Sequence, residues 1–383
     1  MKLYRPNWIE INSNAISENI TAIRQYIKKH AAAAKKSVPE ILAVIKTNAY
    51  GHGMIPVAKT LYSKNIRFFG VMGIDEGIQL RLKLGSKIKI LILGSLYPFN
   101  EAIPAAIRYN LIPTISSNDG ILYLDKLSKK YRKQTGFHLK IDTGMARIGI
   151  SPAGIPGFIE KLADCANVKL DGVYTHFSSA DSNPDYTRQQ IDLFNSCITK
   201  LKNISGLYTP VIHAANSAGL INYPDSFYDM VRPGLSLYGL YPSLESVSKI
   251  KLSPVLSWKT RVIFLKKTGP GKCVSYGCTY KTKRNTVIAT VPVGYGDGYY
   301  RHLSNKGYML INGKKAGIIG RVTMDMAMLD VTDIPETNTG TEVVIIGKSG
   351  KNTITVEELA SLAWTNNYEI VCNLHTRVPR IYE

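Results

Sequence analysis

Eight short apolar runs, separated by segments of helical character, restrict the fold of this sequence more than any other feature. The intervening segments include residues 75–84, 119–133 and 185–202. Strands that alternate with helices over about 240 residues match the count and length of a (β/α)8 barrel. We therefore predict a TIM-like (β/α)8 barrel over residues 13–243. The apolar runs end at Lys46, Gly73, Gly94, Ser116, Asp142, Phe177, Asn216 and Gly239.

The sequence beyond residue 243 changes from this alternation to β-rich segments and turns. The pair Asn312-Gly313 is of the kind that closes a two-residue hairpin. One short helix is expected over residues 355–366. We predict a mostly β C-terminal domain over residues 244–383, which the N-terminal segment 1–12 joins.

The composition is strongly basic, with 48 Lys and Arg against 28 Asp and Glu and a formal net charge of +20. Such a charge attracts nucleic acids and other polyanions. The basic residues are scattered over polar segments, however, and they neither form one stripe nor interleave with aromatic residues. We therefore predict a solvated basic surface and no specific nucleic-acid partner.

The five cysteines give no sign of a disulfide framework or a zinc site, because their number is odd and no two have the CxxC spacing. A reducing cytoplasm is therefore the expected location, and no metal is expected. No apolar stretch approaches the ~18 to 20 residues of a membrane span, so we expect a soluble protein without a membrane partner. The cysteines are Cys165, Cys197, Cys273, Cys278 and Cys372.

Lys46 lies at the C-terminal end of the first apolar run, residues 41–45. In βα barrels, catalytic residues gather at that end of the strands. Position alone favours a lysine that merely extends its amine into water. The polar and glycine-rich residues 48–53 favour a functional lysine instead. A desolvated amine loses its charge and can form a Schiff base with an aldehyde.

Two loops of small residues offer a site for a phosphate group. They are residues 216–219 after the seventh run and residues 232–235 at the eighth. Phosphates bind at backbone N–H groups that small residues leave accessible, and barrels often place such a site after strands seven and eight. Together with a lysine at the end of the first strand, these loops indicate a phosphorylated cofactor.

The stretch AVIKTNAYGHG around Lys46 resembles the signature around the pyridoxal 5'-phosphate lysine of the alanine racemase family. The resemblance covers the whole chain, and it implies an isomerase that interconverts L-alanine and D-alanine with this cofactor. It also implies that the product D-alanine supplies bacterial cell-wall peptidoglycan. Further stretches resemble motifs of the family in the same order: KIDTGMAR, HAANSAG, VRPGLSLYG, CVSYGCTY and RVPR.

The resemblance assigns cofactor contacts to residues near Lys46 and in the two loops of small residues. Arg232 would hydrogen-bond the pyridine nitrogen. Because arginine cannot protonate the ring as a carboxylate partner would favour, the cofactor becomes a weaker electron sink, which should suppress transamination and decarboxylation. The phosphate contacts implied by the resemblance are Tyr50, Ser217 and the backbones of Gly234 and Leu235, and Asn216 is a further cofactor-binding residue.

Three further residues at strand ends receive roles from the same resemblance. Arg147 would contact the phenolic oxygen of the cofactor and the substrate carboxylate. Lys140 is the position that in some members is carbamylated and orients this arginine. From the residues alone, Lys140 can equally be a barrel lysine that pairs with Asp142. His176 would lie near Arg232 and the second base.

Tyr276 is the second catalytic base that the resemblance implies, delivered from the partner subunit of a homodimer to the cofactor face opposite Lys46. Inversion requires two bases, because one removes the Cα proton and the other delivers a proton from the opposite side. An unperturbed tyrosine is a poor base at neutral pH, so a nearby cation is needed. The backbone of Met324 would face the substrate carboxylate, and the substrate entrance would contain Tyr295, Arg301, Arg321 and Asp325.

Thr376 stands where many members of the family carry a tyrosine that narrows the active site. A racemase of serine, or of broader specificity, on the same scaffold is therefore the alternative to an alanine racemase. A decarboxylase with the same cofactor would keep an acidic partner at the pyridine nitrogen, against which Arg232 argues. A cofactor carrier without catalysis would need only the barrel, whereas this chain retains Tyr276 and its domain.

Overall fold

The computed structural model describes residues 4–205 and 210–383, which divide into two compact units. The barrel unit contains Ile16–Ala49 and Met54–Ser253. The β unit contains the residues up to Ala15, the short stretch Tyr50–Gly53 and Pro254–Glu383. The β unit is therefore built from stretches that lie far apart in the sequence, whereas the barrel unit is interrupted only by Tyr50–Gly53.

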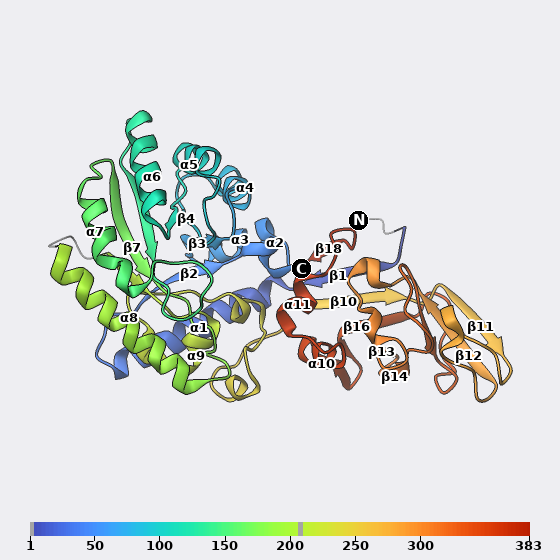
Figure 1. Ribbon diagram of the computed structural model, residues 1–383. Helices are drawn as coiled ribbons and strands as arrows, with labels where there is room; N and C mark the ends of the chain where they lie inside the picture. Colours follow the sequence, from blue (N-terminus) through green and yellow to red (C-terminus); the bar gives the residue numbers. More distant parts are fainter. Residues whose placement is uncertain (1–3, 206–209) are drawn as a thin grey trace. The chain divides into compact units, whose positions relative to one another are not determined.

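The barrel unit is organised around eight parallel strands in the described part of the chain, in the spatial order β4-β3-β2-β9-β8-β7-β6-β5 (Figure 1). The two outer strands approach each other, because Leu91 of β4 forms a parallel bridge with Ile112. The sheet thus nearly closes, and the predicted (β/α)8 barrel is confirmed. The strands are β2 Glu40–Val44, β3 Phe68–Val71, β4 Lys89–Ile92, β5 Thr114–Ile115, β6 Thr135–Lys140, β7 Val168–Tyr174, β8 Val211–His213 and β9 Met230–Val231.

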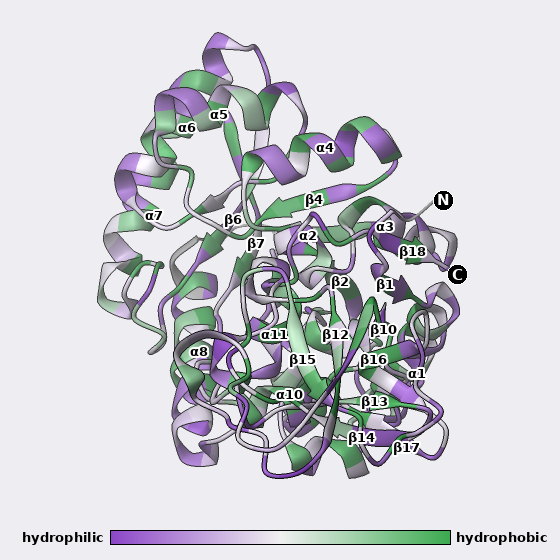
Figure 2. Ribbon diagram, turned by 90° about the vertical axis from the view of Figure 1, so that its right-hand side faces the viewer, coloured by the Kyte–Doolittle hydropathy of each residue, from purple (hydrophilic) through white to green (hydrophobic). Residues whose placement is uncertain are grey.

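The helices that surround these strands present mixed hydrophobic and hydrophilic faces, as the colouring of Figure 2 shows. The apolar face of α1, Ser13–Ala33, is buried through isoleucines at helical spacing such as Ile16, Ile20 and Ile23. The predicted helix 119–133 is α6, which ends at Lys130 because Arg132 adopts a φ of 52°. The other helices are α3 Met54–Ser63, α4 Ile74–Leu84, α5 Phe99–Arg108, α6 Asn118–Lys130, α7 Ile155–Ala163, α8 Pro184–Ser205 and α9 Ser217–Asn222.

The β unit contains one larger sheet, in the order β14-β13-β16-β10-β1-β18 with β17 paired to β16, and a second sheet in the order β11-β12-β15. The predicted hairpin at Asn312-Gly313 is confirmed, since Ile311 pairs with Lys314 and both loop residues have positive φ, 49° and 75°. The strands are β1 Asn7–Ile11, β10 Leu256–Arg261, β11 Phe264–Thr268, β12 Thr286–Val291, β13 Tyr308–Ile311, β14 Lys314–Gly317, β15 Ala327–Asp330, β16 Glu342–Ser349, β17 Asn352–Ile354 and β18 Arg380–Tyr382.

The single helix predicted over residues 355–366 is wrong, because the structure has two helices there, α10 Val356–Leu362 and α11 Asn367–Cys372. Trp364 takes a φ of 57°, which stops the first helix. The side chain of Asn366 then accepts a hydrogen bond from Glu369 N at 2.9 Å and caps the second.

The N-terminal strand β1 lies inside the larger sheet, antiparallel to β10 and parallel to β18. The fully buried indole of Trp258 donates a hydrogen bond to Asn7 Oδ1 at 2.7 Å, which anchors β1 to β10 from the side chains as well. Residues 1–3 of the predicted N-terminal segment lie outside the described residues. Among the helices of the described ranges, none combines the length and apolar composition that a membrane span needs.

We predict that Gly172→Ala lowers the free energy of unfolding by about 1–3 kcal/mol. A Cβ atom at this position of β7 would lie 2.5 Å from the imidazole ring of His138, which packs against the glycine from β6. Chemical denaturation of the two proteins measures the difference.

The matched control is Gly157→Ala in α7, where an added Cβ meets no atom within 4 Å. This variant should gain about 0.5–1 kcal/mol, because alanine favours the helical backbone. Equal stability of Gly172→Ala and the unchanged protein would contradict the close packing of His138.

Candidate active site

Four predicted cationic residues lie at the carboxyl ends of the barrel strands. Lys46 follows β2, Lys140 ends β6, Arg147 lies in the loop after β6, and Arg232 follows β9. Burial lowers the pKa of Lys140 to about 7, and the charges of Arg147, Arg232 and Lys46 contribute, whereas Asp142 opposes them. These cations therefore act on one another, and an anionic ligand would relieve their mutual repulsion.

His176 is drawn into the same cluster from the end of β7. Burial lowers its pKa well below the usual value, and the charges of Arg232, Lys140, Arg147 and Lys46 add to this effect. The imidazole is therefore neutral at physiological pH. Its Nδ1 lies 3.4 Å from Arg232 Nη2, as the predicted proximity of these two residues requires.

The guanidinium of Arg232 is almost fully buried, with 3% of the residue exposed. Its Nη2 donates hydrogen bonds to Thr175 O at 2.7 Å and to Ala214 O at 2.8 Å. Burial lowers the pKa of Arg232 to about 10, so the group stays charged at neutral pH. Backbone carbonyls at the ends of two neighbouring strands thus fix the orientation of this cation.

Arg232 also begins a chain of buried hydrogen bonds that the sequence did not reveal. Its Nη1 donates to His213 Nδ1 at 2.9 Å, and His213 Nε2 lies 2.9 Å from His138 Nδ1. Burial and the charge of Arg232 lower the pKa of His213 well below its usual value. A neutral His213 that accepts at Nδ1 must carry its proton at Nε2 and donate it to His138.

Tyr174 supports this chain and was also missed. Its ring stacks on His213 with a centroid distance of 4.7 Å and an interplanar angle of 7°. The same ring lies 5.5 Å from Lys140 Nζ and 5.1 Å from Arg232 Cζ, so it contacts two of the cations through its π face. Its hydroxyl hydrogen-bonds Thr114 Oγ1 at 2.9 Å, and burial raises its pKa to about 12.

The two loops predicted to bind a phosphate lie against each other. The buried Ser217 Oγ accepts hydrogen bonds from Gly234 N at 3.0 Å and from Ser236 N at 3.2 Å, which connects the loop after β8 to the loop after β9. Asn216 caps α9 through a hydrogen bond from Gly219 N at 2.9 Å, and Leu235 is fully buried. Both loops are therefore ordered by contacts of their own.

The segment after Lys46 has a backbone that sequence patterns do not predict. Thr47, Asn48 and Ala49 have φ values of 54°, 52° and 55°, a left-handed turn that costs roughly 1–2 kcal/mol per residue. Two side chains hold it in place. Glu76 accepts hydrogen bonds from Thr47 N at 2.6 Å and Met72 N at 2.7 Å, and Asn48 Oδ1 accepts one from Met54 N at 2.8 Å. Such strain is typical of functional sites.

Tyr50 belongs to the β unit, where its side chain is buried with its ring centroid 6.1 Å from that of Tyr368. Burial raises the pKa of Tyr50, and the charges of Tyr368 and Cys372 raise it further. Its hydroxyl therefore stays protonated at neutral pH.

Tyr276 lies on an exposed tip of the β unit, with 70% of the residue accessible to solvent. Ser275 Oγ donates a hydrogen bond to Arg321 O at 2.7 Å. The guanidinium of Arg321 lies against Gly277, where an added Cβ would meet it at 3.2 Å. The structure thus places the predicted Arg321 beside the loop that carries Tyr276.

The remaining predicted residues of the β unit are Tyr295, Arg301, Met324 and Asp325. The loop that carries Tyr295 is hydrogen-bonded to the loop that carries Met324. Tyr295 N donates to Thr323 O at 3.0 Å, and Gly296 N donates to Met324 O at 2.9 Å. Met324 and Asp325 are exposed, as is Arg301 in the short turn Arg301–Leu303.

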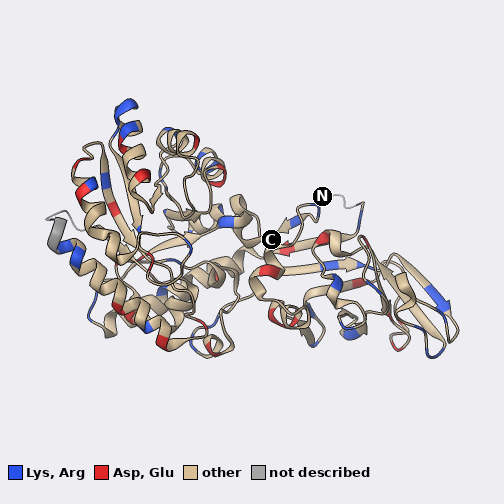
Figure 3. Ribbon diagram, in the orientation of Figure 1, with Lys and Arg blue, Asp and Glu red and all other residues tan. Residues whose placement is uncertain are grey.

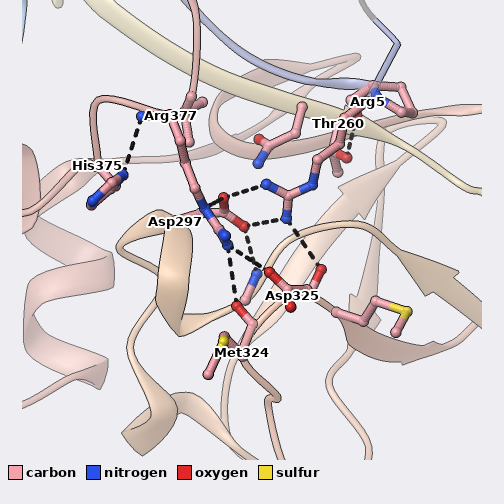
Figure 4. A network of polar contacts seen from close by, with 12 residues as sticks. Arg5, Thr260, Asp297, Met324, Asp325, His375 and Arg377 are labelled. Carbon is pink, nitrogen blue, oxygen red and sulfur yellow. Dashed lines mark hydrogen bonds and ion pairs between the residues drawn. The ribbon is translucent and has the colours of Figure 1, made fainter.

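Asp297 organises this region and was not singled out from the sequence, although it stands in the stretch GYGDGYY. Figure 4 shows its fully buried carboxylate between Arg5 and Arg377. Arg5 binds both carboxylate oxygens, at 2.6 and 2.7 Å, and Arg377 Nε donates at 2.8 Å. Arg377 also reaches Asp325 at 2.9 Å and Met324 O at 3.4 Å, so the predicted Met324 is tied to the C-terminal segment.

The surface charge is dispersed, since Figure 3 shows Lys and Arg spread over many helices and loops, with Asp and Glu among them. Within the described part of the chain, His, Cys, Asp and Glu side chains form no group of three or more that could hold a metal ion. The cations at the ends of the barrel strands are instead the feature that favours binding of an anionic ligand.

The cysteines correct one expectation from the sequence, because Cys273 and Cys278 are joined by a disulfide across the tip that carries Tyr276. The spacing of five residues does not match a zinc or redox CxxC motif, and only the turn of the chain brings the two side chains together. The other three cysteines, Cys165, Cys197 and Cys372, are free thiols.

A (β/α)8 barrel that gathers a strand-end lysine with several further cations defines an enzyme scaffold for an anionic cofactor. The chain belongs to the alanine racemase family. Residues 11–242 match the family described as "Alanine racemase, N-terminal domain", and residues 255–382 match "Alanine racemase, C-terminal domain". Members of this family are pyridoxal phosphate-dependent isomerases of alanine.

Individual relatives extend over the whole chain. Alanine racemases of Halothermothrix orenii and Carboxydothermus hydrogenoformans are each 42% identical, over 100% and 99% of this chain and 98% and 100% of their own lengths. The alanine racemase structure from Clostridium difficile 630 has a TM-score of 0.91 at 32% identity and covers 100% of this chain and 97% of that one.

Two further structures contain ligands. The alanine racemase of Bacillus anthracis with bound L-Ala-P has a TM-score of 0.90 at 35% identity, and the match covers 100% of this chain and 96% of that one. The alanine racemase of Bartonella henselae with covalently bound pyridoxal phosphate has a TM-score of 0.86 at 27% identity, covering 99% of both chains.

We predict that the protein without cofactor, with Lys140 as the unmodified amine, becomes more stable relative to Lys140→Met as the pH rises from about 7 to about 10.5. The pKa of Lys140 is lowered from its usual 10.5 to about 7 in the folded state. Between these values the unfolded chain binds more protons, so the free energy of unfolding increases with pH by at most about 1.4 kcal/mol per pH unit. Below pH 7 both states are protonated, and the penalty of the buried charge is fully present.

Denaturant unfolding of both proteins from pH 6 to pH 10 measures this difference. Lys126→Met, which removes an exposed lysine of α6, serves as the control and should show no such window. A constant difference between Lys140→Met and the unchanged protein across this range would contradict the lowered pKa.

Proposed function

We propose that this chain racemises alanine with Lys46 and Tyr276 as the two bases that act on opposite sides of Cα. The reaction is the interconversion of L-alanine and D-alanine, and pyridoxal phosphate is its cofactor, as in the family. The observation that supports the site most directly is the group of mutually repelling cations around Lys46 at the strand ends of the barrel.

The residues of the barrel unit suit pyridoxal phosphate. Ser217 and the backbones of Gly234 and Leu235 would hold the phosphate, and Asn216 would be a further cofactor contact. Tyr50 is proposed as a phosphate contact on the resemblance alone. The excess of cations over carboxylates complements a phosphate dianion and a substrate carboxylate. When bound, the cofactor supplies an electron-withdrawing ring that acidifies the Cα proton of the attached amino acid.

Arg232 would donate a hydrogen bond to the pyridine nitrogen and keep its own proton. Its pKa of about 10 keeps the guanidinium protonated at neutral pH, and its carbonyl partners fix its position. The nitrogen therefore gains a hydrogen bond without being fully protonated. This moderates the electron demand of the ring and favours return of the proton to Cα over other reactions.

Racemisation then depends on proton transfer at two amino acid side chains. In one direction, the Tyr276 oxygen takes the proton from L-alanine and the Lys46 amine delivers a proton to the opposite side; the reverse direction exchanges these roles. Arg147 would hold the substrate carboxylate, with the Met324 backbone near it. Tyr295, Arg301, Arg321 and Asp325 would surround the substrate entrance.

Lys140 is proposed to be carbamylated and to orient Arg147. Its pKa of about 7 supports this, because an appreciable fraction of the amine is uncharged at neutral pH and can react with carbon dioxide. The product is a carbamate, whose negative charge would pair with Arg147. Asp142 instead uses Oδ1 to accept hydrogen bonds from Gly144 N at 2.9 Å and Ala146 N at 3.1 Å.

A homodimer with an active site shared between subunits is part of this proposal. Tyr276 is 70% exposed on the β unit, on an ordered tip that a second subunit could receive. The predicted cytoplasmic location and the supply of D-alanine to peptidoglycan complete the proposal.

A serine or broad-specificity racemase is the second candidate, for which Thr376 is the supporting observation. Thr376 is exposed next to Arg377, in the segment that the buried Asp297 holds. A threonine in place of a tyrosine leaves more room for a substrate side chain larger than methyl.

We predict that Lys46→Ala abolishes racemisation of L-alanine, because it removes one base and the amine that binds the cofactor. Chiral chromatography after incubation with L-alanine, and in parallel with L-serine, measures the D-isomers formed by each protein. The control is Lys64→Ala, which removes an exposed lysine after α3 and should keep full activity.

Substantial D-alanine from a clean Lys46→Ala preparation would refute the role of Lys46. D-serine formed by the unchanged protein at a rate similar to that of D-alanine would favour the second candidate.

We predict that Tyr276→Phe slows loss of the Cα hydrogen from L-alanine by at least about 100-fold, and from D-alanine far less, since general-base catalysis contributes about 10²–10⁴-fold. Solvent exchange at Cα, followed by NMR for each enantiomer, measures both rates. Tyr97→Phe, which alters a tyrosine of the barrel unit that is 78% exposed, is the control. Equal loss for both enantiomers would contradict the assignment.

A further inference from the structure

We propose that Cys273 and Cys278 form a reversible thiol–disulfide modification site that sets the position of Tyr276. This inference rests on the proposed role of Tyr276 as a base. The two Cα atoms are 4.9 Å apart, and the closed ring contains Tyr276 among the four residues between the cysteines. No larger loop is spanned, so the bond acts on the tyrosine segment alone.

The backbone of this segment is one that ordinary side chains disfavour. Ser275 and Cys278 have φ values of 60° and 48°, on the two sides of Tyr276, and Gly277 has a φ of 71°. Only glycine adopts such values readily, so two of these residues need an external restraint to stay there. The disulfide at Cys278 is one such restraint.

The base of the tip is fixed independently of the disulfide. Val274 N donates to Tyr280 O at 3.0 Å, and the Val274 side chain is buried with Ile288 and Ile319. Cys273 also forms an antiparallel bridge with Lys281. Reduction would therefore leave the fold of the β unit in place and change only the tip beyond Val274.

Beyond Val274, the tip has a second restraint in the hydrogen bond from Ser275 Oγ to Arg321 O. This bond acts on the N-terminal side of Tyr276, whereas the disulfide holds the C-terminal side. Without the disulfide, the backbone at residues 277 and 278 is free to relax from its left-handed values. The tyrosine hydroxyl would then occupy its catalytic position for a smaller fraction of the time.

Both Cys273 and Cys278 are exposed on the single chain, so redox reagents reach the pair when the tip is not received by a second subunit. Of the three free cysteines, Cys165 and Cys197 are buried and Cys372 is half-buried. Mild reagents should therefore act on Cys273 and Cys278 first. This selectivity makes the modification separable from damage at the other thiols.

The reaction is a thiol–disulfide exchange. Two thiols of the chain form one S–S bond and lose two protons and two electrons, and a small disulfide such as oxidised glutathione accepts them to become two thiols. In the reverse direction, a phosphine reductant with water converts the S–S bond to two thiols and becomes a phosphine oxide.

The test compares the holoenzyme after oxidised glutathione with the holoenzyme after a phosphine reductant, each freed of reagent. Thiol titration under denaturing conditions should count three thiols in the oxidised protein and five in the reduced one. Exchange of the Cα hydrogen should be about fivefold slower in the reduced enzyme for L-alanine, and nearly unchanged for D-alanine, because a small misplacement of one base affects its own step.

The double variant Cys273→Ser/Cys278→Ser should match the reduced enzyme and show no response to either reagent. The control is Cys165→Ser, whose hydroxyl can replace the thiol that donates to Lys161 O, and which should keep the full redox response. A reduced protein that does not form the Cys273–Cys278 disulfide again with oxidised glutathione would overturn the proposal. So would a disulfide without any change in rate, or an equal change for both enantiomers.

Measuring Tyr276→Phe in the same experiment distinguishes failure of the base role of Tyr276 from failure of the redox site. An equal loss for both enantiomers in this variant would overturn the base role of Tyr276, and this inference with it. Suppose that Tyr276→Phe slows Cα exchange unequally for the two enantiomers, while the exchange rates of the unchanged protein are the same in the oxidised and reduced states. This result would overturn the modification site alone.

Discussion

The buried guanidinium of Arg232 is the interaction on which the rest of the site depends. A buried cation is stable only where polar groups replace its hydration, and here two backbone carbonyls and His213 do so. The carbonyls come from the ends of neighbouring strands, so satisfying the charge also fixes where β7 and β8 end. The imidazole of His213 in turn hydrogen-bonds His138 and fixes the position of its ring, for which Gly172 leaves room.

Around this fixed charge the barrel holds further cations that repel one another. Lys140 responds with a lowered pKa, and His176 stays neutral. The folded chain is therefore less stable without an anionic ligand than its packing alone would make it, and a ligand that neutralises the cations adds its binding free energy to folding. The left-handed turn after Lys46 adds a second local cost, which Glu76 and Asn48 offset.

Much of this arrangement could be predicted from the sequence, because buried parallel strands appear as apolar runs and a barrel requires eight of them. The position of Lys46 at a strand end followed from the same runs. The eighth run was expected to continue to Gly239, whereas β9 ends at Val231, directly before Arg232. Three features could not be predicted: the left-handed turn, the hydrogen bond from Thr47 N to Glu76, and the His213–His138 contact. The two contacts join residues far apart in the chain, and the turn depends on φ values that its residue types do not indicate. The end of helix α10 before Trp364 and the disulfide between Cys273 and Cys278 could not be predicted for the same reason.

The pairing of β1 with both β10 and β18 has a consequence for synthesis of the chain. The barrel strands are all translated by Val231, whereas the larger sheet of the β unit lacks an edge strand until Arg380–Tyr382 leave the ribosome. The first strand to be made can pair with β10 earlier, but its second neighbour, β18, is the last strand to be made. Domains generally fold as units during translation, so the barrel is free to form while the β unit is still incomplete.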